Sequence, residues 1–412
     1  MISSENFFLN IHSKTQDELF DMYIYLERYI NDGSPSGFEL GLPASYSPFG
    51  HQKSVHIPVL LDSWKNHLQI GKIPNIFSYT QENIPFFVHP FILDEVAIFE
   101  DIKHLIVNTV EVQPTASGRT VFWHDKRQSV VPWFIKLHYP TLLGRFSREL
   151  NLFRWLAILE RSRELFTLTS IFPKDFCFLY DAGGTFFQNK EPGLNFGTIF
   201  RETAPSPKLG SKYLLIPSFS LFATKNNNGN GTSLLSDLIE FCDLTPDRFL
   251  DLLIFPLINS YIFLIRKLGM IPEFNAQNVL YELDIASKQV RVVFRDVGDC
   301  FIDFEIREME NLHLNFCSYK TLDPLRHHDI FQRRSFAFDF KLSHYILLPL
   351  LNEFSKSTSF SRSHLVLRVK EYFKSKFPAY PKYFNSEKWY SYPNEFGVNR
   401  DSYIENSDPI FR

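Results

Sequence analysis

The sequence predicts an α+β fold, with strands in the middle of the chain and helices on either side of them. Three patterns lead to this prediction. The first 32 residues carry apolar side chains at helical spacing, the residues from Val107 alternate with a period of two, and helical spacing returns from residue 233. The chain has 412 residues, of which 44% are apolar, so it can bury a large core and form two or three domains.

The first half of the chain divides into a helix, a turn-rich region, a strand pair and a second helix. The first helix ends at the breaker NDGSPSG, and residues 33–88 are rich in proline and turn residues. Two strands, RTVFWHD and VVPWFIKLHYP, flank the polar turn DKRQS. Apolar spacing then predicts an amphipathic helix over about residues 141–166.

The second half returns to strands before it becomes mainly helical. Residues 167–223 alternate like strands, and the polar loop at residues 225–233 marks a candidate domain boundary. Helical spacing continues over residues 233–268. A β-hairpin follows, and two further helices are expected at residues 341–356 and 363–376.

The composition argues against several classes of protein. A formal net charge of -3 gives no global positive field to attract nucleic acid. The four cysteines are far apart and form no CxxC pair, so we expect reduced, buried thiols. The N-terminus lacks the pattern of a signal peptide, and the most apolar run, residues 252–265, is shorter than the ~20 residues of a membrane span. We therefore expect a soluble, cytoplasmic protein that binds neither nucleic acid nor membrane, with the apolar run as a core helix.

Cationic side chains gather along the first predicted strand pair. If the DKRQS turn is central, Arg119 lies nearly opposite Lys136, and two like charges in this position need an anion between them. Arg148 is expected on the first turns of the next helix, whose N-terminus also favours negative charge. Ser117 and Thr120 add hydroxyl donors. This set predicts a polyphosphate cradle; the alternative is a solvated strand face in which Lys136 pairs with a glutamate.

Oxygen-bearing side chains gather at the open end of the hairpin that turns at DIASK. Asn278 begins one strand and Asp296 ends its partner, so antiparallel pairing brings the two side chains close together. A carboxylate and an amide oxygen suit Mg²⁺, and protein kinases hold Mg²⁺ with the same pair. Glu273, Asn275 and Gln277 alternate toward one side, where they are expected to orient a nucleotide or a reacting carboxylate. The alternative is a polar hairpin end in which Asp296 pairs with the neighbouring arginine or another cation.

Together these stretches resemble the NRPS-independent siderophore synthetases, the aerobactin-synthetase family. Six motifs of this family occur here in the family's order: VHPFI at 88–92, SGRT at 117–120, KL at 136–137 with Arg148 twelve residues after the lysine, FRE at 200–202, EFNAQN at 273–278 and FRD at 294–296. The terminal NSDPIF is similar to the family's closing element. The resemblance covers roughly residues 85–300.

The resemblance implies a cupped-hand synthetase architecture. A reduced thumb would cover residues 1–88, β-rich fingers residues 89–228, and a mainly helical palm residues 229–412. The implied enzyme binds ATP and Mg²⁺ between fingers and palm and adenylates a citrate-like carboxylic acid. It then condenses the acid with an amine or hydroxyl nucleophile and releases AMP and pyrophosphate. The resemblance also favours a homodimer.

The resemblance also assigns roles to individual residues. Lys136, Arg119 and Arg148 would be the catalytic cations on the phosphates. The other nucleotide-binding residues would be Ser117, Thr120, Glu273, Asn275, Gln277, Asn278 and Asp296, of which the last two would also hold Mg²⁺.

The sequence departs from the family at several points, among them Gly144-Arg145 where the family has Thr-Ser. Asn275 stands where the family has a histidine, and asparagine cannot titrate near neutral pH. The early HPxHPxxK motif is missing, and FGHQKS at residues 49–54 stands in its place. Two other functions therefore remain open: a kinase-like small-molecule phosphotransferase, and a family member that binds ATP without catalysis.

Two histidine positions have competing interpretations. His89 could support the nucleotide pocket, or it could be a histidine hydrogen-bonded at the turn before Pro90. The histidine pair in LRHHD, residues 325–329, could hold a metal or lie on the surface.

Overall fold

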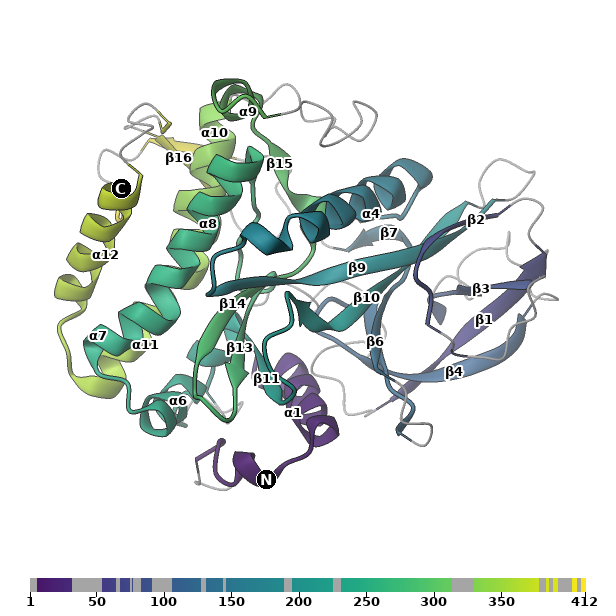
Figure 1. Cartoon of the computed structure of the whole chain (residues 1–412), viewed down its shortest axis with the longest axis horizontal. Coiled ribbons are helices and arrows are strands. Elements are labelled where there is room, and N and C mark those ends of the chain that lie inside the picture. The colour runs from purple at the N-terminus through teal and green to yellow at the C-terminus, as the bar shows by residue number, and fades with distance from the viewer. Residues whose placement is uncertain are drawn as a thin grey trace.

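An eleven-stranded mixed sheet connects the strand-rich and helix-rich ends of the molecule in the computed structural model (Figure 1). The structure describes residues 6–31, 54–63, 67–74, 76, 83–90, 106–126, 131–143, 146–188, 195–224, 231–312, 330–377, 383–384, 388–391, 402–405 and 409–412. In sheet order, the strands are β11 (Tyr213–Pro217), β13 (Val279–Asp284), β14 (Val290–Phe294), β9 (Phe176–Phe187), β10 (Phe196–Ser206), β6 (Trp133–Lys136), β5 (Thr120–Trp123), β4 (Ile106–Pro114), β1 (Val55–Ser63) and β3 (Asn83–Phe87). Strand β2 (Leu68–Gly71) pairs with β9. The parallel pairing of β14 with β9 joins the two ends of the sheet.

The two central strands of the predicted cationic hairpin are buried on both faces. Strand β6 has the sequence WFIK, and all four of its residues are buried. Phe122 and Phe134 pack into the largest hydrophobic core, whereas Val121 and Ile135 pack into a second core on the other side. Because side chains alternate between the faces of a strand, Lys136 lies on the same face as Phe134 and points toward the largest core.

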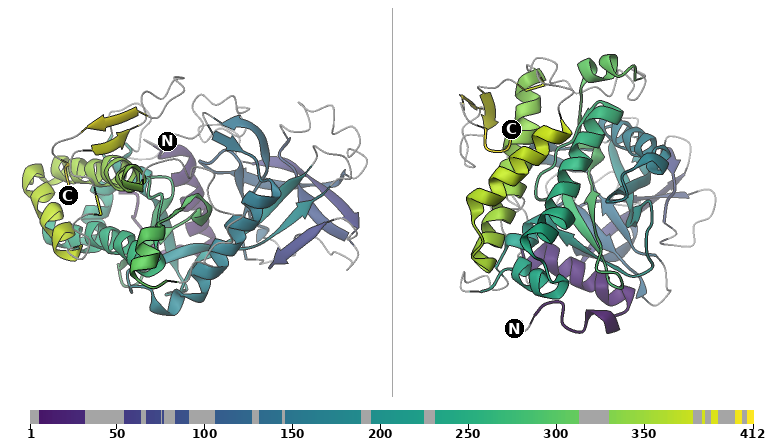
Figure 2. Two further views of the ribbon diagram at one scale, coloured as in Figure 1. Left: turned by 90° about the horizontal axis from the view of Figure 1, so that it is seen from above. Right: turned by 60° about the vertical axis from the view of Figure 1, so that its left-hand side comes forward.

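Helices group mainly beyond β13 and β14, at the opposite end from β1 and β3 (Figures 1 and 2). They are α5 (Ser218–Phe222), α6 (Leu234–Cys242), α7 (Pro246–Phe249), η7 (Leu250–Ile254), α8 (Phe255–Leu268), α9 (Phe304–Met309), α10 (Ile330–Ser335), η11 (Phe336–Leu347), α11 (Leu348–Thr358) and α12 (Arg362–Lys376). Helices α8 and α12 lie side by side, with the rings of Phe255 and Tyr372 stacked 3.8 Å apart. Helix α4 (Leu152–Thr167) instead packs along β9 and β10.

Helices α7, η7 and α8 follow one another over Pro246–Leu268. By length and composition this segment of 23 residues could cross a membrane, but 67% of its most apolar stretch is buried inside the protein. In the part of the chain that the structure describes, it is the one segment of this kind. The prediction of a core helix over residues 252–265 is confirmed.

The helix predicted over residues 141–166 is wrong in its first part. Tyr139–Leu143 and Phe146–Arg148 form the paired strands β7 and β8, and α4 begins only at Leu152. Asn151 is the N-cap, and its Oδ1 accepts a hydrogen bond of 3.0 Å from the Arg154 N–H. Arg148 therefore lies at the end of strand β8 and not on the first turns of α4.

The region expected to form a reduced thumb contributes to both ends of the molecule. Helix α1 (Gln16–Tyr29) packs against β11, whereas β1, β2 and β3 join the sheet beside β4 and β9. The division at residues 88 and 228 stays a prediction.

The prediction of buried thiols is confirmed for the described residues, because Cys177, Cys242 and Cys300 are buried and form no disulfide. Several predicted features lie wholly or partly outside the described residues: Cys317, most of FGHQKS and of the polar loop 225–233, the end of VHPFI, LRHHD and part of NSDPIF.

Candidate functional site

Asp296 lies just after β14 and holds cations from two neighbouring strands. Lys136 Nζ forms an ion pair with Asp296 Oδ1, and Arg201 Nη2 lies 3.4 Å from the same oxygen. The Lys136 side chain is 2% exposed and that of Asp296 is 21% exposed. Burial acts to raise the pKa of Asp296, but the charges of Lys136, Arg201 and Arg119 outweigh it and hold the pKa well below its usual range. The anion that Lys136 needs is therefore this aspartate, and Asp296 pairs with Lys136 and Arg201.

Arg201 connects this pair to a second buried carboxylate. Its Nε donates to Asp181 Oδ1 at 2.7 Å and its Nη2 to Asp181 Oδ2 at 3.2 Å. The two residues are cross-strand partners on β10 and β9, and both are buried. Burial acts to lower the pKa of Arg201, but Asp181 and Asp296 raise it, so the guanidinium stays charged. Arg201 stands in the FRE motif, but the sequence analysis did not select it as a site residue.

The turn that joins β4 to β5, residues 115–120, carries three of the predicted phosphate-binding residues. Ser117 Oγ accepts the Thr120 N–H at 2.8 Å, and Gly118 adopts a left-handed φ of 71°. Thr120 is the cross-strand partner of Lys136, and the Leu137 N–H donates to the Arg119 carbonyl at 2.9 Å. The register is thus one residue from the prediction, and Thr120, not Arg119, faces Lys136.

Arg119 and Arg148 meet at one corner of the site. The Arg119 guanidinium donates to the backbone carbonyl of Arg148, and its charge acts on Asp296. Lys136 and Arg119 therefore both act on Asp296 at the end of the β13–β14 hairpin, whereas Arg148 contacts Arg119 through its backbone carbonyl. The catalytic role of these cations stays a prediction.

The amide-rich loop before β13 is closed by its own side chains. Asn275 Oδ1 accepts the backbone N–H groups of Gln277 and Asn278, each at 2.9 Å. Asn278 Nδ2 donates to the Glu273 carbonyl at 3.3 Å, and the Glu273 carboxylate lies 2.8 Å from Lys341 Nζ on η11. Asn275 therefore shapes the turn that presents Asn278, which is a role that an asparagine performs well.

The hairpin register places Asn278 and Asp296 near each other but not opposite. Val279 pairs with Phe294, and the Arg295 N–H donates to the Asn278 carbonyl at 2.9 Å, so Asp296 lies one residue further on. Among the described residues, no group of three or more His, Cys, Asp and Glu side chains could hold a metal ion. One carboxylate with one amide still fits Mg²⁺, which retains several waters in its protein sites.

Two histidines support the site. His89 is buried, its Nε2 lies 3.3 Å from the Gly118 carbonyl, and burial lowers its pKa to about 4. Neutral His89 therefore braces the 115–120 turn as a hydrogen-bonded histidine before Pro90, and its support of a nucleotide pocket stays a prediction. His138, which the sequence analysis did not select, accepts the Leu150 N–H on Nδ1 at 3.0 Å. Burial, assisted by Arg119, lowers the pKa of His138 to about 4.

This architecture is the fold of the siderophore synthetases, and the predicted α+β class and family resemblance are confirmed at the level of the fold. No protein-family model matches the sequence, and no curated protein matches it significantly. The petrobactin biosynthesis protein AsbB from Bacillus anthracis superposes with a TM-score of 0.63 at 14% identity, over 94% of this chain and 78% of that one. ATP-bound aerobactin synthetase IucA from a hypervirulent Klebsiella pneumoniae superposes with a TM-score of 0.65 at 13% identity, over 91% of this chain and 76% of that one. Aerobactin synthetase IucC from the same source superposes with a TM-score of 0.60 at 14% identity, over 82% of this chain and 65% of that one.

Proposed function

We propose that this protein is an ATP-dependent acid–amine ligase of the siderophore-synthetase type. It adenylates a citrate-like carboxylic acid and passes the acyl group to an amine or hydroxyl nucleophile. The observation that carries the proposal is the convergence of Lys136, Arg201 and Arg119 on Asp296, on a fold shared with an ATP-bound synthetase. A small-molecule acid and a small-molecule amine are the proposed partners, and the cytoplasm is the proposed location.

The charges of the site favour a polyphosphate. Three cations, Lys136, Arg119 and Arg201, surround two carboxylates, Asp296 and Asp181, so one net positive charge remains in a mostly buried setting. Buried cations interact with phosphate oxygens more strongly than cations in water do. Thr120 faces Lys136 across the ladder, and Ser117 can turn its hydroxyl hydrogen toward a phosphate oxygen.

In the proposed reaction, a carboxylate oxygen of the acid attacks the α-phosphorus, and the bond from that phosphorus to the bridging oxygen breaks. Lys136 and Arg119 offset the charge that grows on the phosphate oxygens as pyrophosphate leaves. The amine then attacks the acyl carbon, AMP leaves, and the amine proton passes to solvent. The site's contribution to this second step is to hold the acyl-adenylate in place.

Asp296 and Asn278 are the residues that we propose to hold Mg²⁺. Both of the ion-pair contacts of Asp296 use Oδ1, and its carboxylate together with the Asn278 amide supplies the hard oxygens that the ion prefers. When bound, the ion neutralises part of the phosphate charge. Asn275 cannot replace a titrating histidine. We therefore propose that it holds the conformation of the loop and takes no part in proton transfer.

Product analysis tests the proposed function. The protein is incubated with ATP and Mg²⁺, with citrate or 2-oxoglutarate as the acid, and with a panel of polyamines. We expect AMP and pyrophosphate in equal amounts, and exchange of labelled pyrophosphate into ATP with the acid alone. ADP as the product would instead identify a phosphotransferase. Thermal stabilisation by ATP and Mg²⁺ without turnover on the whole panel would identify a non-catalytic ATP-binding protein.

A further inference from the structure

Helix α1 is fixed to the helix-rich end of the molecule. The Gln16 side-chain amide pairs with both backbone groups of Tyr213 on edge strand β11, donating to its carbonyl and accepting its N–H, each at 3.0 Å. Near the other end of the helix, Ser220 Oγ donates to the Leu26 carbonyl at 3.2 Å. These contacts hold the helix in register with β11 and α5.

The same helix also contacts the cationic hairpin through two exposed or partly exposed ion pairs. Lys126 Nζ lies 2.6 Å from the Asp21 carboxylate, and His124 Nε2 lies 3.4 Å from that of Asp17. Asp17 and Asp21 are one turn apart, so they form one face of α1 directed at the end of β5. Helix α1 therefore contacts both β11 and α5 at the helix-rich end and the β5 end of the cationic hairpin.

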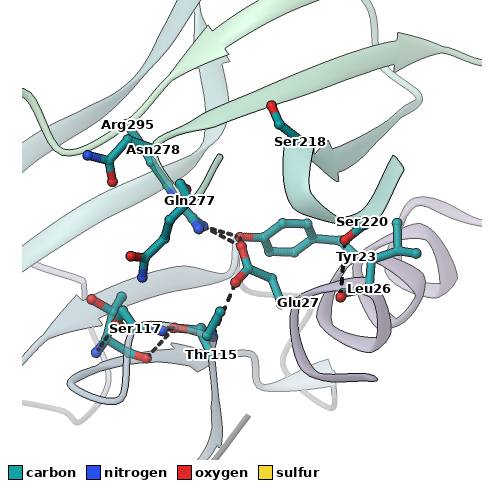
Figure 3. Close-up of polar contacts among 12 residues, drawn as sticks. Tyr23, Leu26, Glu27, Thr115, Ser117, Ser218, Ser220, Gln277, Asn278 and Arg295 are labelled. Atoms are coloured by element: carbon teal, nitrogen blue, oxygen red, sulfur yellow. Dashed lines mark hydrogen bonds and ion pairs between the residues drawn. The ribbon is translucent and has the colours of Figure 1, made fainter. Parts of the chain in front are cut away.

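A buried carboxylate on the inner face of α1 joins the two halves of the site (Figure 3). Glu27 is fully buried, and its Oε2 accepts the Ala116 N–H at 3.2 Å, within the 115–120 turn. Its Oε1 accepts the Tyr23 hydroxyl at 2.7 Å and forms an ion pair with Arg295 Nη1. Arg295 Nη1 also donates to the Tyr23 oxygen at 2.9 Å. We call these four residues the Glu27 latch.

Arg295 extends the latch to the end of the β13–β14 hairpin. Its Nε donates to the Gln277 carbonyl at 2.7 Å, and its backbone N–H donates to the Asn278 carbonyl. Asp296 follows directly, with a left-handed φ of 70° that turns its carboxylate toward Lys136. The direction of Asp296 thus depends on how Arg295 is held, and Arg295 is held by Glu27.

We propose that Glu27 is a positioning residue that sets the phosphate-binding turn and the Asp296-bearing hairpin end in one geometry. One carboxylate binds both segments, which are far apart in the chain. The catalytic consequence rests on the proposed function. The mechanical coupling of the two segments does not depend on it and can be measured on the free protein.

Three variants on one helix test the latch. Glu27→Gln keeps the size and one oxygen acceptor but removes the charge that binds Arg295. Tyr23→Phe is a milder change, which removes the hydroxyl shared by Glu27 and Arg295. Asp21→Asn is the matched control, because it makes the same kind of change in an ion pair whose side chains are 50% and 46% exposed.

Hydrogen exchange is the first measurement, and it needs no nucleotide. We expect Glu27→Gln to raise exchange at least ~10-fold in peptides covering both 115–120 and 277–296, because local opening loses protection in the segments that the carboxylate held. Tyr23→Phe should raise exchange in the same two segments by less, and Asp21→Asn in neither. Faster exchange in only one segment, or in neither, would overturn the latch. If Glu27→Gln does not fold, Tyr23→Phe decides the question by the same criterion.

Turnover is the second measurement, made where circular dichroism shows every variant fully folded. We expect Glu27→Gln to lower kcat for pyrophosphate release about 10-fold or more, since small displacements of catalytic groups are costly, whereas Asp21→Asn keeps the wild-type rate. A purely structural role would lower the melting temperature and leave kcat per folded molecule unchanged, and that result would overturn the positioning role. A wild-type protein without ATP-dependent turnover would refute the proposed function, while the exchange result would still decide the latch.

Discussion

Asp296 differs from an ordinary aspartate because its single carboxylate lies between cations of two neighbouring strands. Lys136 contacts it from β6 and Arg201 from β10, and the charge of Arg119 reaches it from the 115–120 turn. These cations would repel one another in its absence, so the carboxylate contributes to stability as well as to the site.

The depressed pKa of Asp296 makes its contribution to stability depend on pH in a definite direction. The unfolded pKa is about 3.9, and the folded pKa is lower. The stabilisation is therefore complete above about pH 5 and is lost as the pH falls toward the folded pKa. We expect Asp296→Asn to lower the free energy of unfolding by about 3 kcal/mol at neutral pH, and the difference from wild type to shrink below about pH 4. Urea unfolding from pH 7 to pH 2 measures this, and a difference that grows on acidification would contradict it.

Lys136 and Arg119 are expected to act on the reaction itself. Lys136→Ala and Arg119→Ala should each lower the rate of pyrophosphate release at least ~10²-fold, which is comparable to the loss of one preorganised donor to a developing anion. Lys72→Ala is a suitable control. Lys72 lies near Trp133, which is on the same strand as Lys136, but its side chain is 66% exposed and pairs with Glu202. Near-normal rates in both site variants would remove these residues from the reaction.

Local patterns predicted the cations of the site better than their partners. Lys136 and Arg119 were identified because a cation in an apolar strand needs an anion. The identity of that anion depends on the sheet, since Asp296 lies 160 residues from Lys136. Arg201 and Asp181 were missed for the same reason, because the pairing of β10 with β9 brings them together. Glu27 carries no local signal at all, since its partner Arg295 is 268 residues away.

At the scale of elements, the segment between β6 and α4 shows where periodicity misleads. Leu142, Phe146 and Leu150 have helical spacing, yet the chain forms the β7–β8 pair before Asn151 caps α4. The apolar spacing continues across Asn151, so it does not reveal the boundary that this cap sets. The β13–β14 hairpin was predicted correctly because the DIASK turn and two alternating runs agree with each other.

The loop before β13 depends on the side chain of Asn275 for its conformation. Asn275→Ala removes the acceptor of two backbone N–H groups, so we expect a loss of about 1–2 kcal/mol in the free energy of unfolding. Asn275→Asp keeps the acceptor and should stay close to wild type. Denaturant unfolding of the three proteins makes the comparison. Equal losses in both variants would mean that the amide nitrogen, and not the Oδ1 acceptor, is the group that matters.

For the molecule as a whole, one sheet carries the strands that supply Lys136 and Arg201 and the hairpin that leads to Asp296. Strands β5 and β6 supply Thr120 and Lys136, β10 supplies Arg201, and Asp296 follows Arg295 just beyond the end of β14. The α+β class could be predicted from the order of patterns along the chain. The continuity of the sheet could not be predicted from that order, because the parallel pairing of β14 with β9 joins segments that lie over 100 residues apart.

A shared sheet predicts that the two ends of the molecule unfold together. We expect one thermal transition by circular dichroism and by tryptophan fluorescence, with coincident midpoints. ATP and Mg²⁺ at 100 times the dissociation constant should shift this whole transition upward, with a stabilisation of about 2.7 kcal/mol. Lys136→Ala should unfold in one step as well but lose most of the nucleotide shift, since it removes the proposed phosphate contact and leaves the sheet in place. Two separate transitions, of which ATP moved only one, would show that the ends of the molecule fold independently and that the nucleotide binds to one of them alone.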